Sequence, residues 1–98
     1  MSRKKKKQFE ADFQVDDELD LHGFYRHEIR DILFTFIREC RADKSHVVAV
    51  VVGRGHHSNG SEGVLKSYVQ TLLNEAEIHY ESAPPRLGGE GVLILELA

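Results

Sequence analysis

Residues 46–60 have the sequence HVVAVVVGRGHHSNG, and the rest of the chain can be arranged around this stretch. Val47–Val52 is an almost continuous run of β-branched residues, which predicts a central strand with both faces covered. An amphipathic run begins at Val64 and predicts a helix. The glycine-rich segment Gly53–Gly60 therefore joins a strand to a helix, the place where α/β proteins commonly bind a ligand.

The composition of this loop favours a phosphate as the ligand. Glycines expose backbone N–H groups, and the N-terminus of the following helix adds partial positive charge. Arg54 supplies a planar cation, and His56 and His57 can carry a proton near neutral pH. We therefore expect Gly53, Arg54, Gly55 and His56 to contact substrate and His57 to take part in catalysis. The alternative is a flexible polar loop with solvated histidines.

Hydrophobic periodicity predicts the remaining elements on both sides of this stretch. They are strands at 18–22, 78–83 and 92–97 and helices at 26–41 and 63–75. The resulting order is β-α-β-α-β-β. Two helical crossovers imply three strands that run in the same direction, and the last pair is expected to be antiparallel.

The first strand alternates polar and apolar residues, so only one of its faces can bury side chains. Leu19 and Leu21 point to the core, whereas Glu18, Asp20 and His22 point away from it. Because the polar face of this strand has nothing apolar to bury, both helices are expected on one face of the sheet. The predicted fold is an α/β two-layer sandwich with a mixed four-stranded sheet.

The Asp20 carboxylate is expected to orient or assist the His22 imidazole, and both residues are expected to face the glycine loop. They lie two residues apart at the carboxyl end of the first strand, and the loop follows the carboxyl end of the second. In a parallel sheet these ends share one edge, so the pair can meet Arg54 and His57 across a cleft. A surface Asp–His pair with no function is the alternative.

Charge divides the chain into two parts. The net charge is −3, but five of the 13 basic residues lie in Arg3–Lys7, and residues 8–98 carry a net −8. Residues 1–17 are therefore predicted to be a basic, flexible extension that either grips nucleic acid or only aids solubility, and residues 18–98 to be the folded domain. No segment has the length and apolarity of a membrane span or a signal peptide, so a cytoplasmic location without membrane contact is the expectation.

These groups suit the cleavage of a phosphodiester. One imidazole can take a proton from an attacking hydroxyl, a second acid can protonate the leaving oxygen, and Arg54 with the loop N–H groups can stabilise the charged transition state. With RNA the neighbouring 2′-OH can attack, so we expect no cofactor. The alternative is a divalent metal held by Asp20, His22 and His57, although their spacing matches no recognised metal site. Glu28 is expected to be a solvated carboxylate in the first helical turn.

Three motifs resemble those of the Smr (small MutS-related) domain family. Residues 19–23, LDLHG, are similar to its first motif, and Gly53-Arg54-Gly55 with His57-Ser58 is similar to its second. Residues 83–85, APP, followed by 88–92, GGEGV, resemble its third. The resemblance runs from about residue 18 to residue 97, which is nearly all of the predicted folded domain. Many members carry histidine just before the first glycine of the second motif, where this chain has Val52.

The resemblance implies a fold like the C-terminal domain of bacterial translation initiation factor three. It also implies endonuclease activity on DNA or RNA, including messenger RNA on ribosomes, usually assigned to the aspartate and histidine of the first motif. These are Asp20 and His22 here. The motif glycine Gly23 and the loop residue Ser58 are added to the expected substrate contacts.

We therefore predict a nucleic-acid endonuclease of the Smr type, with RNA slightly preferred over DNA because the expected chemistry works without a metal. The expected partners are nucleic acid, either RNA or DNA, and the ribosome. The alternative is a non-catalytic module that binds nucleic acid or a ribosome surface through the same cleft.

Overall fold

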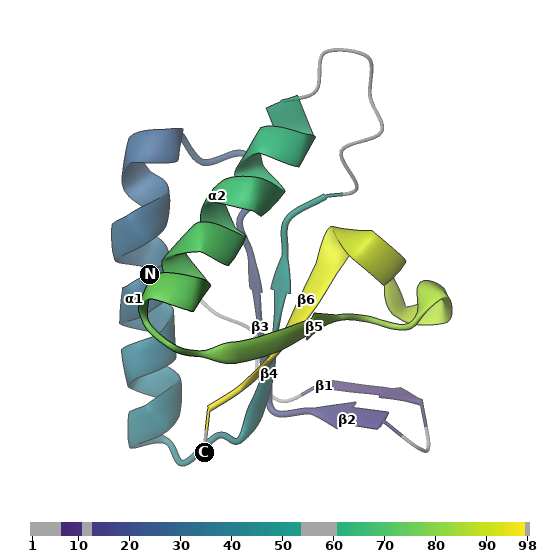
Figure 1. Ribbon diagram of the computed structural model, residues 1–98. Helices are drawn as coiled ribbons and strands as arrows, with labels where there is room; N and C mark the ends of the chain where they lie inside the picture. Colours follow the sequence, from purple (N-terminus) through teal and green to yellow (C-terminus); the bar gives the residue numbers. More distant parts are fainter. Residues whose placement is uncertain (1–6, 11–12, 54–60, 98) are drawn as a thin grey trace.

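Four strands form one mixed sheet in the computed structural model, which describes residues 7–10, 13–53 and 61–97 (Figure 1). The strands lie in the order β3-β4-β6-β5. Their bounds are Asp17–Asp20 for β3, Val47–Val51 for β4, His79–Ser82 for β5 and Val92–Glu96 for β6. β3 and β4 are parallel, whereas β6 pairs antiparallel with both β4 and β5. Three strands therefore share one direction and the last is reversed, as the sequence predicts.

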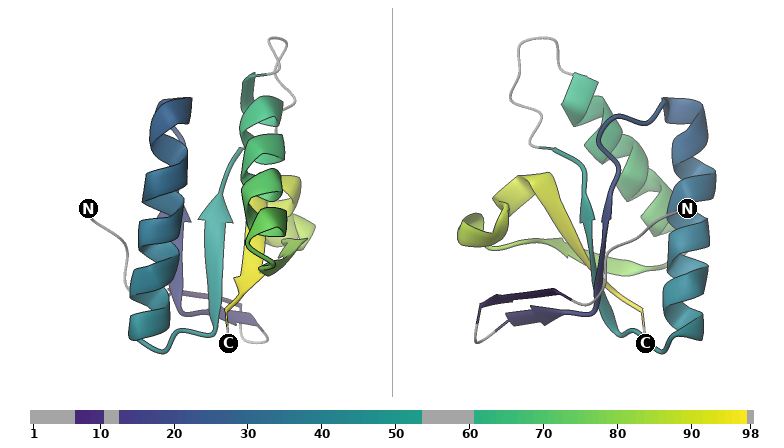
Figure 2. Two further views of the ribbon diagram at one scale, coloured as in Figure 1. Left: turned by 60° about the vertical axis from the view of Figure 1, so that its left-hand side comes forward. Right: turned by 180° about the vertical axis from the view of Figure 1, so that it is seen from behind.

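Two helices cover one face of this sheet, which confirms the predicted two-layer α/β arrangement (Figures 1 and 2). They are α1 (Arg26–Ala42), which follows β3, and α2 (Ser61–Glu75), which follows β4. Each is a crossover between strands that run in the same direction, so both helices begin at the same edge of the sheet. α2 begins two residues before the predicted start.

The apolar run of β4 serves both faces of the sheet. Val48, Val50 and Val52 point to the helices and join a core built from both helices, whereas Val47, Ala49 and Val51 point to the other face. Because successive side chains of a strand alternate between faces, only a strand covered on both sides tolerates such a run. The expectation of a central strand is thus confirmed.

A hairpin lies within the segment for which the sequence predicts a flexible extension. β1 (Lys7–Glu10) pairs antiparallel with β2 (Phe13–Val15). Val15 is fully buried in a small second cluster with Ala49, Ala83, Val92 and Ile94, on the sheet face that the helices leave uncovered. Burying Val15 against this apolar face removes hydrophobic surface from water, which is favourable. The basic composition of the segment gives no sign of this packing. The division into 1–17 and 18–98 stays a prediction.

Asp16 fastens the start of β3 to the start of β4. Its carboxylate Oδ2 accepts the N–H groups of His46 at 2.7 Å and Val47 at 3.2 Å, and its own N–H donates to the Val47 carbonyl at 2.7 Å. Hydrogen bonds to a charged group are stronger than neutral ones. This residue therefore holds the two parallel strands in register at the edge where they begin.

Replacing Asp16 with alanine should lower the free energy of unfolding by about 2 kcal/mol, since two backbone donors lose a charged acceptor. Asp16→Asn retains an acceptor oxygen and should cost roughly half as much. Asp31→Ala, at an exposed aspartate within α1, is the matched control and should stay within about 0.5 kcal/mol of the parent. Urea denaturation measures all three variants, and equal losses for Asp16→Ala and Asp31→Ala would refute the assignment.

Candidate functional site

The described members of the first two motifs lie at one edge of the sheet. Asp20 pairs with Val51 in the parallel β3–β4 ladder, and the Leu21 N–H extends the pairing to the Val51 carbonyl at 3.0 Å. His22 and Gly23 follow on one side and Gly53 on the other. Arg54, Gly55, His56, His57 and Ser58 lie outside the described residues, so their expected roles stay predictions.

Asp20 holds the backbone of His22, which differs from the expected pairing of carboxylate and imidazole. β3 ends at Asp20, and its Oδ1 accepts the His22 N–H at 2.9 Å. Residues 21–24 then form a turn closed by the Phe24 N–H on the Leu21 carbonyl at 3.4 Å. An aspartate that accepts the N–H two residues ahead is a common device for starting a turn, and here it competes successfully with continuation of the strand.

Gly23 allows this turn to place His22 outside the sheet. Its φ is +92°, a value that other residues rarely adopt, although a Cβ there would meet nothing within 4 Å. His22 and Asp20 are both exposed. The constraint on Gly23 is therefore conformational, and its result is an imidazole presented to solvent at the edge of the sheet.

Glu28 caps α1 and does not project as a solvated group. Its Oε1 accepts the Tyr25 N–H at 3.0 Å, and the Glu28 N–H donates to the Tyr25 carbonyl at 2.9 Å. The carboxylate also sits in the first turn, where it complements the helix dipole. Its role is thus to fix the angle at which the 21–25 segment enters the helix.

The third motif also reaches this edge of the sheet. The sequence alone assigned no role to this motif. Two short 3₁₀ turns, η1 (Pro85–Leu87) and η2 (Gly89–Gly91), lead into β6. The Gly91 carbonyl accepts the N–H groups of Val52 at 2.8 Å and Gly53 at 3.1 Å. Gly88 has φ +116°, and a Cβ there would overlap the Val92 side chain. Through these hydrogen bonds the motif fixes the position of the backbone where the Gly53–Gly60 loop begins.

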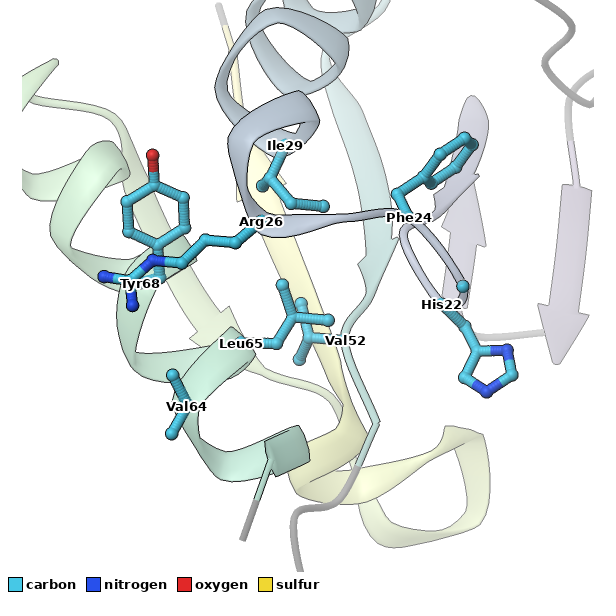
Figure 3. Close-up of a pocket in the computed structure, with 9 residues that line it drawn as sticks. His22, Phe24, Arg26, Ile29, Val52, Val64, Leu65 and Tyr68 are labelled. Atoms are coloured by element: carbon cyan, nitrogen blue, oxygen red, sulfur yellow. The ribbon is translucent and has the colours of Figure 1, made fainter.

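A pocket of about 310 Å³ opens between α1 and α2 beside this edge (Figure 3). Its apolar walls come from Ile29, Val52, Val64 and Leu65. The guanidinium carbon of Arg26 lies 4.6 Å from the centroid of the Tyr68 ring, which also borders the pocket. His22, Gly23 and Phe24 complete the lining, and Figure 3 shows the His22 and Phe24 rings turned away from the centre. Val52 is 1% exposed, so the position where many family members carry histidine here provides only apolar surface.

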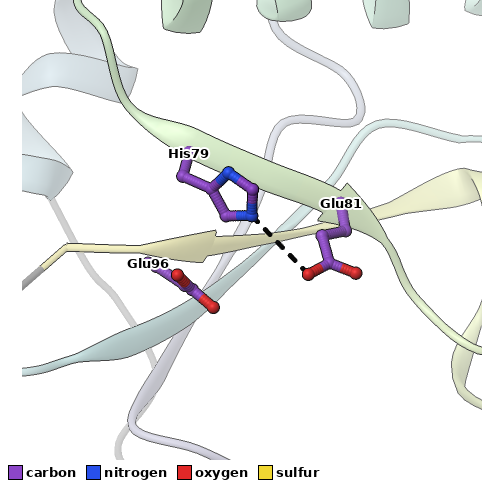
Figure 4. A group of neighbouring side chains, drawn as sticks. All are labelled: His79, Glu81 and Glu96. Carbon is purple, nitrogen blue, oxygen red and sulfur yellow. Dashed lines mark ion pairs between the residues drawn. The ribbon is translucent and has the colours of Figure 1, made fainter.

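A separate polar cluster lies on the opposite face of the sheet (Figure 4). His79 Nε2 is 3.6 Å from Glu81 Oε2, and Glu96 lies across from His79 in the β5–β6 register. All three are exposed, and their ligand atoms lie within 4.8 Å of one another. A second pocket of about 320 Å³ is bordered by Glu81 and Glu96, with Val47 and Ile94 among its apolar lining residues. Glu96 pairs with Val47 and Asp20 with Val51, so this cluster is at the other end of the strands from Asp20.

In the part of the chain that the structure describes, no helix has the length and apolarity needed to cross a membrane.

The chain is similar in sequence to two curated proteins. The chain is 36% identical over 76 residues to an uncharacterized protein of Treponema pallidum, covering 74% of this chain and 37% of the relative. It is 32% identical over 66 residues to an Smr domain-containing protein of Schizosaccharomyces pombe, covering 67% of this chain and 32% of the relative. The chain thus spans about a third of the length of these curated relatives.

Two solved structures share the fold. The stand-alone small MutS-related protein YdaL of Escherichia coli matches with a TM-score of 0.74 and 29% identity over 82% of this chain and 63% of that one. The Smr domain of Thermus thermophilus MutS2 matches with a TM-score of 0.71 and 25% identity over 83% of this chain and 96% of that domain. The family model of the Smr domain matches residues 19–98, from the first motif through the third, and the chain belongs to the Smr domain family.

Proposed function

We propose that this chain is a nucleic-acid endonuclease of the Smr type that cleaves single RNA phosphodiester bonds in preference to DNA. One observation carries the proposal: three polar or glycine-rich segments, 20–23, 53 and 88–91, meet at the sheet edge where both helices begin. Helix N-termini carry partial positive charge, and this edge also presents an exposed imidazole. Membership in the Smr family supports the same reading.

In the proposed reaction His22 is the general base. Its imidazole removes the proton from a 2′-OH, the resulting oxygen attacks the neighbouring phosphorus, and the bond from phosphorus to the 5′-oxygen breaks. His57 donates a proton to that leaving oxygen. Arg54, Gly55 and the other loop contacts, Gly53, His56 and Ser58, stabilise the negative charge that grows on the phosphate. The products are a 2′,3′-cyclic phosphate and a 5′-OH.

Asp20 acts in this scheme through the backbone. Its carboxylate holds the His22 N–H and so sets the turn that presents the imidazole. Gly23 contributes the φ that the same turn needs. Both are positioning residues, whereas His22 is the group that meets the reacting atoms. A divalent metal is not required by this scheme, since the nucleophile and both proton carriers belong to RNA and protein.

Replacing the general base His22 should slow cleavage without weakening the binding of RNA. His22→Ala should lower turnover of a labelled single-stranded RNA by ~10²–10⁴-fold with little change in affinity, because general acid–base groups act mainly on the chemical step. Arg54→Ala should impair both, since a phosphate contact acts in ground and transition states. His27→Ala, at an exposed histidine on the first turn of α1, is the control and should retain activity.

The same assay distinguishes the mechanisms through the product ends. We expect a 2′,3′-cyclic phosphate, no inhibition by chelator and no cutting of a strand that is 2′-deoxy at the scissile position. Ends that carry a 5′-phosphate and form only with a divalent metal would refute the scheme. Binding without any turnover at high protein concentration would identify a binding module in place of an enzyme.

The role of Asp20 can be tested with two substitutions. Asp20→Ala should speed amide exchange of His22 by about twofold to tenfold, the equivalent of one exposed hydrogen bond, and should lower turnover. Asp20→Asn keeps an acceptor oxygen and should preserve both. Hydrogen exchange followed by NMR gives the first readout and the cleavage assay the second. If Asp20→Asn protects the amide but is as inactive as Asp20→Ala, the carboxylate charge is needed and the positioning role is wrong.

The basic segment at the N-terminus is proposed to bind the phosphates of the nucleic acid without contacting the scissile phosphate. Replacing Lys4–Lys7 with alanine should weaken binding and flatten its salt dependence, since fewer counterions are released, and should leave turnover at saturating substrate unchanged. Titrations at several salt concentrations measure the slope. An unchanged slope would show that this segment serves only solubility.

A further inference from the structure

The exposed apolar surface of the described chain is concentrated beside the candidate site. Two large hydrophobic side chains are exposed there, Phe24 at 44% and Val64 at 52%. Both line the pocket between α1 and α2, whereas Tyr25 is also exposed but does not line it. Apolar side chains gathered at one place on a surface mark a contact with another molecule.

The pocket provides a hydrophobic interior with a cationic, aromatic rim. Ile29 and Val52 are almost fully buried and form its inner wall together with Leu65. At the rim the Arg26 guanidinium lies over the Tyr68 ring, which presents a planar cation backed by an aromatic face (Figure 3). Bases of single-stranded nucleic acids stack on aromatic rings and on guanidinium planes.

The pocket also shares residues with the cleavage edge. His22 and Gly23 belong to both, because the turn that presents the imidazole forms one wall of the pocket. A nucleotide whose phosphate lies at this edge therefore has its base within reach of the pocket. A volume of about 310 Å³ is at the small end of ligand pockets and suits one ring system.

We propose that this pocket receives one unpaired base next to the scissile phosphate, so that the substrate is single-stranded nucleic acid or the unpaired loop of a folded one. The inference rests on the proposed nuclease function and specifies its substrate. In a duplex the bases are stacked and paired, and bringing one into the pocket costs the unstacking and unpairing of that base. Single strands and loops avoid this cost.

Charge distinguishes this pocket from the second one on the opposite face. The two have similar volumes, but the second is bordered by Glu81 and Glu96, which repel a polyanion. Arg26 borders the first. Of these two pockets, the one beside His22 therefore combines base-sized apolar space with a cation.

An abasic scan tests the proposal. The probes are fluorescent 12-nucleotide RNAs of one sequence, 2′-deoxy at the mapped cut so that binding is measured without turnover, in which one base at a time is removed. Removal at one position beside the cut should weaken binding by about tenfold, the effect of one lost stacking contact, and removal elsewhere by less than about twofold. A fully paired duplex of the same sequence should bind more weakly than the single strand.

Substitutions of residues that line the pocket should reduce this loss of binding at the abasic position beside the cut. Tyr68→Leu deletes the aromatic face and Val64→Ser deletes apolar surface at an exposed position, so each should weaken binding of the intact strand and shrink the penalty at the sensitive position. Tyr68→Phe keeps the ring and should behave as the parent does. Tyr25→Ala is the matched control, since this exposed aromatic residue does not line the pocket. Thermal denaturation checks the fold of Tyr68→Leu, and Val64→Ser keeps the test valid if that variant is unstable.

The outcomes separate this inference from the function on which it rests. If the protein cuts RNA but no abasic position matters, or if duplex and single strand bind equally, the base pocket is refuted and the nuclease stands. If Tyr25→Ala also removes the loss of binding at the abasic position, the base pocket is refuted. Concentration-dependent dimers that Val64→Ser disrupts would identify a second copy of the chain as the occupant. Failure to bind or cut any nucleic acid refutes the function itself.

Discussion

The parallel pairing of β3 with β4 is the constraint on which the candidate site depends. It aligns Asp20 with Val51, so the turn after one strand and the glycine loop after the other start at the same edge. It also fixes where α1 and α2 begin, and it thereby brings two helix N-termini to that edge. Asp16 holds the opposite ends of the two strands through the N–H groups of residues 46 and 47. A slip in this register would move every member of the site relative to the others.

The insertion of β6 between β4 and β5 completes the edge. Because β6 runs against β4, it begins where β4 ends, and Gly91 at its start can accept two N–H groups from the beginning of the glycine loop. Lys66 on α2 also approaches this segment, with its Nζ 3.6 Å from Glu90 Oε1. Because the Glu90 carboxylate is exposed, this ion pair contributes little to the stability of the fold. It links the first half of α2 to the turn before β6. The third motif therefore supports the backbone where the loop begins, through the Gly91 carbonyl.

The two faces of the sheet have different chemistry. The helix-covered face carries the main core and, at its rim, the pocket with Arg26 and Tyr68. The other face carries a smaller cluster closed by Val15 and, toward the far end of the strands, His79, Glu81 and Glu96. Glu81 and Glu96 thus lie at the far end of the strands from the edge that bears His22, so this acidic pair does not oppose the approach of a polyanion there.

The order of elements, the direction of each of the four main strands and the placement of both helices on one face follow from the sequence. Periodicity reports burial along each segment, and the polar face of β3 excludes a second helical layer. Parallel topology also predicts that Asp20, His22 and Gly53 share an edge. These features depend on local pattern and chain connectivity, which the sequence contains directly.

Tertiary structure alone decided four other features. The Asp20 carboxylate binds the His22 backbone in place of its imidazole, because the turn at Gly23 ends the strand early. Val15 at the end of β2 packs on a sheet face that forms only once the four strands have paired. The Gly91 contacts and the pocket between the helices arise from residues that are distant along the chain. Such contacts depend on strand order and packing, and no periodicity within one segment encodes them.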